Sequence, residues 1–129
     1  MEKLDLKRHH KALYNPPKGT FALVDVPPLT YVKLDGEGDP NSAEAYRTGV
    51  SWLYSVSYAM KFAVKARLGR DYVVGPLEAL WWADDMSSFT ARKKSDWRWT
   101  IMILQPDFVT SELFAAALDK AGKKLGAPP

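Results

Sequence analysis

The chain has 129 residues, of which 47% are hydrophobic and 26% charged, a composition typical of one soluble globular domain. It contains no cysteine, which excludes disulfides, thiol catalysis and cysteine-bound zinc. The net charge of +3 comes from interspersed acids and bases, so we expect no nucleic-acid partner. We expect a cytoplasmic protein without a membrane span, because the start Met1–Asp5 is charged and no apolar run approaches roughly 20 residues.

Residues 1–20 are polar and rich in basic side chains, and we predict an irregular N-terminal arm followed by a single domain over residues 21–129. His9 and His10 are the only histidines, and they are adjacent on this arm. Two neighbouring histidines with no third ligand near them in sequence are more typical of a solvated arm than of a metal site. We therefore expect neither a metal nor a cofactor.

Two strands and a turn are predicted next. Phe21–Val26 is the first strand candidate, and Pro27-Pro28 ends it because proline cannot donate a hydrogen bond to a sheet. Tyr31–Asp35 resumes extended structure, with Val32 and Leu34 on one face. Residues 36–40 form a turn rich in glycine, and this turn lacks the third glycine of a dinucleotide-binding loop.

A long helix is predicted from about Ser42 to Leu68. Asn41 is the expected N-cap, and Glu44 follows it at the spacing of a capping box. Gly69 suits the C-terminal end. Residues at steps of three and four form one largely apolar stripe, which must pack on a sheet or another helix. The stripe consists of Tyr46, Val50, Leu53, Ser57, Met60, Val64 and Leu68.

The segment from Val74 to Ala83 is predicted to be a strand with a single carboxylate, Glu78. Side chains alternate along a strand, so Glu78 shares one face with Leu80 and Trp82, whereas Trp81 lies on the other face. A carboxylate on an otherwise apolar face is costly to bury without a partner, and proteins use this arrangement for general acids and bases. The plainer interpretation is a half-exposed glutamate at a sheet edge.

The last part of the chain predicts a loop, a strand and a helix. Residues 84–96 form a polar hairpin loop, and Trp97–Leu104 is the next strand, with Arg98, Thr100 and Met102 on one face. Thr110 or Ser111 starts the last helix. The element order predicts an α+β fold, in which a small antiparallel sheet carries two helices on one face: a strand–helix–strand–strand unit plus a C-terminal helix.

An ordered set of motifs supports a family resemblance. The motifs are Val24–Pro27, Tyr31–Asn41, Leu53-Tyr54, Pro76–Trp82, Trp97–Ile103 and Gln105–Thr110. Together they resemble the GyrI-like small-molecule-binding proteins, in particular the stand-alone bacterial branch that includes cyclopropanoid hydrolases. The resemblance implies strand–helix–strand–strand units, normally two in one chain, with a ligand cleft between them. This chain matches the first half only.

The resemblance also implies site residues. Glu78 is the tentative catalytic position, and Tyr31 with Trp81 or Trp82 would form the aromatic wall of the cleft. Apart from the resemblance, Arg98 and Met102 complete the expected ligand-binding set, and Arg98 and Asp35 are the nearest candidates by strand face for a second polar group. Because the second half of the family pattern is absent, a homodimer is expected to complete the cleft; the alternative is that the chain is a fragment or a half without the function.

Three functions remain open from the sequence. The first is a module that binds flat, aromatic or cationic small molecules, with Trp and Tyr supplying contact area and Glu78 the counter-charge. The second is a hydrolase that opens strained, cyclopropane-bearing alkylating compounds, with Glu78 acting on a water molecule or on the leaving carbonyl. The third is a structural dimer, in which the exposed tryptophans are interface contacts. The first requires only a cleft and is preferred.

Overall fold

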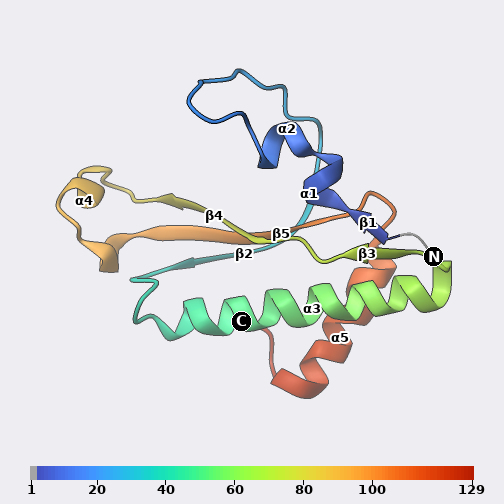
Figure 1. Ribbon diagram of the computed structural model, residues 1–129. Helices are drawn as coiled ribbons and strands as arrows, with labels where there is room; N and C mark the ends of the chain where they lie inside the picture. Colours follow the sequence, from blue (N-terminus) through green and yellow to red (C-terminus); the bar gives the residue numbers. More distant parts are fainter. Residues whose placement is uncertain (1–2) are drawn as a thin grey trace.

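A three-stranded antiparallel sheet lies at the centre of the computed structural model, which describes residues 3–129 (Figure 1). Its strand order is β2-β5-β4. The strands are β2 (Thr30–Glu37), β4 (Leu77–Trp82) and β5 (Arg98–Gln105). The register places Glu78 opposite Met102 and Tyr31 opposite Leu104. Glu78, Met102 and Tyr31 therefore lie on the same face of the sheet.

Both long helices lie on one side of this sheet, which confirms the predicted α+β class (Figure 1). Helix α3 (Glu44–Leu68) packs against β2 and β5, and helix α5 (Ser111–Leu125) packs against α3. Helix α3 therefore buries two sides; the predicted stripe includes Leu53 on the sheet side and Met60 on the α5 side, but it omits Trp52 and Val56. Its sheet-facing cluster contains Leu53, Trp99, Ile101 and Ile103; the cluster facing α5 contains Trp52, Val56, Met60, Ala117 and Ala121.

The helix ends follow local hydrogen bonding, and one prediction about them was wrong. Asn41 does not cap α3, whose N-cap is Ala43, without a side-chain hydrogen bond. Asn41 instead donates its backbone N–H and its side-chain amide to Asp39 Oδ1, at 2.9 and 3.1 Å, within the turn after β2. Gly69 ends α3 in the left-handed region with φ 64°, as predicted. Thr110 is the cap of α5, because its Oγ1 accepts from the backbone N–H of Leu113 at 3.2 Å.

Residues 3–14 form regular elements where the sequence predicted an irregular arm. They are β1 (Lys3–Asp5), α1 (Leu6–His9) and α2 (Lys11–Tyr14). Strand β1 pairs in parallel with β3 (Asp71–Val73), a strand that the sequence reasoning did not predict. Asp5 accepts backbone hydrogen bonds at the start of α1, and Leu6 is buried. A single buried leucine in a basic segment is too weak a pattern to reveal this docking.

The predicted strand Phe21–Val26 is absent. Residues 15–28 are all exposed and form a loop that stands away from the sheet on the side opposite α3 (Figure 1). The exposed fractions of Phe21 and Leu23 are 109% and 102%, the values of side chains without contacts. The composition favours a strand, but a strand also needs a neighbour for its backbone hydrogen bonds, and within residues 3–129 none lies beside this segment.

The remaining elements refine the predicted hairpin. The strand expected over residues 74–83 is shorter, since β4 begins after Pro76. Its connection to β5 contains a short helix, α4 (Ser87–Thr90), and one 3-10 turn, η1 (Lys94–Asp96). No helix within residues 3–129 combines the length and apolar character needed to cross a membrane.

Gly36 permits the close approach of β2 to the core. It pairs with Trp99, and a Cβ atom at this position would lie 2.1 Å from Cη2 of the buried indole. We predict that Gly36→Ala lowers the free energy of unfolding by about 1–3 kcal/mol, because the ring must shift in a packed core. Denaturant unfolding measures this change.

Gly122→Ala is the matched control. In α5 the added methyl group would meet Trp52 at an ordinary 3.8 Å, and alanine favours the helix by about 1 kcal/mol over glycine. The control variant is expected to be as stable as the unchanged chain or more stable. Equal effects of the two substitutions would contradict the proposed clash.

Candidate functional site

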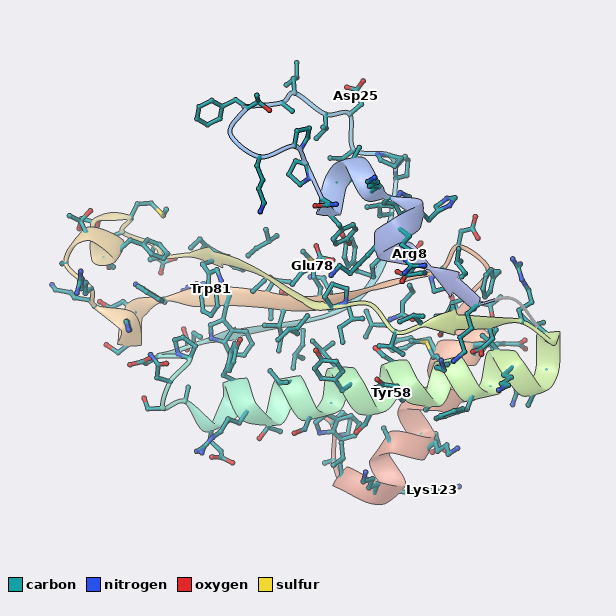
Figure 2. The ribbon with its side chains drawn as sticks, in the orientation of Figure 1. Arg8, Asp25, Tyr58, Glu78, Trp81 and Lys123 are labelled. Carbon is teal, nitrogen blue, oxygen red and sulfur yellow. The ribbon has the colours of Figure 1, made fainter. Side chains whose placement is uncertain are left out.

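Glu78 lies on the sheet face opposite α3 and accepts hydrogen bonds from two tyrosines. The Tyr14 hydroxyl donates to Oε2 at 2.7 Å, and the Tyr31 hydroxyl donates to Oε1 at 3.5 Å. Figure 2 shows Glu78 on the side of the sheet that faces α1 and α2. One carboxylate and two phenols, from three different elements, therefore meet at one point.

Three parts of the fold place these side chains. Tyr14 is the last residue of α2, which β1 and α1 hold over the sheet through the pairing of β1 with β3. Tyr31 is near the start of β2 and Glu78 near the start of β4, and β5 separates these two strands. The strand pairings fix Tyr31 and Glu78, whereas Tyr14 depends on the docking of the N-terminal segment.

Both phenols are held in their protonated form. Burial, the hydrogen bond to Glu78 and the neighbouring Tyr31 hydroxyl raise the pKa of Tyr14 well above its usual value. Burial also raises the pKa of Tyr31; the neighbouring Tyr14 hydroxyl opposes this, and the charge of Glu78 adds to it. At neutral pH the two tyrosines are therefore proton donors that face a carboxylate.

This arrangement suits acid–base chemistry on a small molecule. A carboxylate can accept a proton from an attacking water molecule, and neutral phenols can donate hydrogen bonds to an oxygen that gains negative charge. An open surface depression of about 590 Å³ lies beside Tyr14 and is also lined by Lys7, Arg8, Lys11 and Asn15; neither Glu78 nor Tyr31 lines it. Within residues 3–129, no three His, Asp or Glu side chains gather as metal ligands.

The structure brings together some predicted site residues and separates others. Tyr31, Glu78 and Met102 lie together. Trp82 shares the face of Glu78 but lies about 13 Å further along β4. Arg98 is opposite Trp82, and its guanidinium binds Asp84 at 2.9 Å, so it is a rim ion pair distant from Glu78.

Trp81 lies on the other face of the sheet. Its ring packs 6.0 Å from that of Tyr46 in α3 and 6.0 Å from that of Trp97. Trp82 is therefore the tryptophan of this pair that can line a site containing Glu78. Asp35, considered with Arg98 as a second polar group, hydrogen-bonds Lys33 and Thr100 at the surface.

The sequence reasoning missed Tyr14. It lies in a basic segment that predicted an irregular arm, and the only available signal was an isolated aromatic residue before Asn15. Its partner Glu78 is 64 positions away, and no local pattern connects two positions so far apart.

Comparisons with known proteins give structural matches only. No family model and no curated protein matches the chain. Three solved structures from Listeria innocua do: an uncharacterized conserved protein (37% identity, TM-score 0.83) and two hydrolases (36%, 0.81; 35%, 0.77). Each match covers 95% of this chain. The chain thus shares its fold with proteins that include hydrolases.

The matched chains are longer. This chain spans 60%, 60% and 61% of their respective lengths. None of the three is described as GyrI-like, so that resemblance stays a prediction.

We predict that Tyr14 ionises late in an alkaline titration. The pKa of Tyr14 is higher in the folded than in the unfolded protein. The hydrogen bond from Tyr14 to Glu78 therefore stabilises the fold fully below the usual tyrosine pKa, and this stabilisation is lost as pH rises through the folded pKa. Tyr14→Phe should lower the free energy of unfolding at neutral pH by about 1–2 kcal/mol. The tyrosinate absorbance difference between the two proteins should appear only well above pH 10.

Tyr58→Phe is the control for this titration, because its ring lies exposed on α3, away from Glu78. It should leave stability at neutral pH nearly unchanged. If the absorbance difference between the unchanged chain and Tyr14→Phe shows that the missing phenol titrates with an ordinary tyrosine pKa, the hydrogen-bonded geometry is contradicted.

Proposed function

We propose that this chain forms the catalytic wall of a hydrolase for small electrophilic molecules, with Glu78 as the acid–base residue. The observation that carries the proposal is the meeting of the Glu78 carboxylate with the Tyr14 and Tyr31 hydroxyls. The similarity to two hydrolases of Listeria innocua supports the reaction class.

The proposed substrates carry a strained ring conjugated to a carbonyl, the class implied by the family resemblance. Glu78 accepts a proton from water while the water oxygen bonds to a ring carbon. The carbon–carbon bond of the ring breaks, and its electron pair moves through the conjugated system to the carbonyl oxygen. This oxygen takes up one proton from solvent while Glu78 releases the proton it accepted, so the net reaction adds one water molecule and restores the carboxylate. Tyr14 and Tyr31 donate hydrogen bonds to the Glu78 carboxylate and hold it in place for this proton transfer.

Binding without turnover is the second candidate. Leu80 and Trp82 are 57% and 37% exposed on the same face as Glu78. An exposed indole beside an apolar side chain, with a carboxylate further along the same face, suits a flat aromatic cation that extends along β4. This function requires the same face of the sheet but no acid–base chemistry.

Glu78→Gln separates the two candidates. As a probe we suggest a spirocyclopropyl cyclohexadienone, which water converts to a phenol with a large change in ultraviolet absorbance. For a hydrolase, we predict that the variant lowers the rate constant of this conversion by about 100-fold or more and still binds the probe. For a module that binds cations, the variant should instead lose affinity for the cation.

Glu112→Gln is the control, since it makes the same change on an exposed residue of α5. It should retain full activity. If Glu78→Gln and Glu112→Gln convert the probe at the same rate, Glu78 is not the acid–base residue.

Trp82→Ala tests the aromatic wall. We predict about tenfold weaker binding of a flat aromatic cation such as acridine orange, because the exposed indole face is lost. Fluorescence titration of the dye measures the affinity. Trp81→Ala is the contrasting variant: its ring packs on Tyr46, so stability should fall while the affinity of the folded protein changes little. Unchanged affinity of Trp82→Ala would remove Trp82 from the site.

A further inference from the structure

The loop segment Phe21–Val26 exposes several apolar side chains that neither the core nor the candidate site explains. Phe21, Leu23 and Val26 are exposed by 109%, 102% and 65%, and Val24 by 41%. Singly exposed apolar residues are common, but a run of them without internal contacts is the pattern of an interaction site. Within residues 3–129, no other segment covers these side chains.

The chemistry of the segment is that of a β-strand. It contains an aromatic and two β-branched residues, and Pro27-Pro28 ends it at a defined point. Its backbone N–H and C=O groups have no partners among the strand pairings of residues 3–129. An extended segment of this kind is ready to add to the edge of another sheet.

Strand β4 offers a free edge of the same length. It pairs only with β5, and within residues 3–129 no strand occupies its outer side. It has six residues, Leu77–Trp82, as does Phe21–Val26. Leu80 and Trp82 are exposed beside this edge, so an added apolar strand would cover them. The other edge strand, β2, has the first turn of α5 beside its start, where the two line a common pocket.

We propose that two copies of this chain exchange these segments, so that Phe21–Val26 of each copy adds to the outer edge of β4 of the other. The exchange is a closed twofold arrangement, because the same two surfaces are used on both copies. It pairs the free backbone N–H and C=O groups of the segment and of the β4 edge, and it covers the exposed apolar side chains at the same time. The added strand would also lie beside the strand that carries Glu78 and give that site a second wall. The proposal does not depend on whether Glu78 is catalytic.

The oligomeric state tests this proposal directly. Light scattering on a size-exclusion column should give the mass of a dimer for the unchanged chain at micromolar concentration. Phe21→Asp should raise the dimer dissociation constant about tenfold or more, because it places a charge in the buried apolar contact. Circular dichroism should be unchanged, since Phe21 makes no contacts within one chain.

Phe62→Asp is the matched control. Phe62 is a 54% exposed phenylalanine on α3, on the opposite side of the sheet from the loop. It should dimerise like the unchanged chain. A monomer at all concentrations, an assembly larger than a dimer, or equal dimerisation of Phe21→Asp and the unchanged chain would each overturn the proposal.

Cross-linking tests whether the segment adds to the edge of β4. The chain contains no cysteine, so only the introduced cysteines can react with the cross-linker. Leu23→Cys and Leu80→Cys are made as separate proteins, mixed and treated with a short bismaleimide. We expect a covalent dimer of one copy of each variant, and no such product when Leu23→Cys is mixed with Phe62→Cys. If both mixtures, or neither, give the covalent dimer, β4 is not the edge that receives the segment.

Discussion

The burial of one face of β5 beneath α3 is the constraint on which the rest of the structure depends. Trp99, Ile101 and Ile103 are fully buried against Leu53, and Gly36 allows the indole to approach β2. Once this face is turned inward, strand alternation turns the other face of all three strands toward the N-terminal segment. The position of Glu78 opposite α3 is thus a consequence of apolar packing on the far side of the sheet.

The site at Glu78 depends on a second, weaker constraint. A half-buried carboxylate is stabilised by donors, and here they are two phenols whose own pKa values are raised by burial and by that carboxylate. One donor comes from the sheet and the other from α2, which is held by the three-residue pairing of β1 with β3. The core fixes half of the site, and a short peripheral contact fixes the other half.

Two parts of the surface have groups that lack packing or hydrogen-bond partners. The outer edge of β4 and the Phe21–Val26 segment each present backbone groups and apolar side chains without partners within residues 3–129. The solved proteins with this fold are longer, and this chain spans about 60% of their length. A site whose second wall comes from additional polypeptide, either in the same chain or from another copy, agrees with both facts.

The sequence by itself determined the elements with strong periodicity or strong caps: α3 up to Gly69, the last helix α5 from Thr110 or Ser111, and the alternating faces within β4 and within β5. These patterns placed Glu78 and Trp82 on one face of their strand and Trp81 on the other, whereas the strand register of the structure put Met102 on the face of Glu78. Only the tertiary structure decided that Tyr14 reaches Glu78, that Arg98 is held by Asp84, and that Phe21–Val26 is not a strand. The reason is physical: periodicity encodes which side of an element is buried, whereas contacts between distant segments and the pairing of a strand depend on what lies beside them in space.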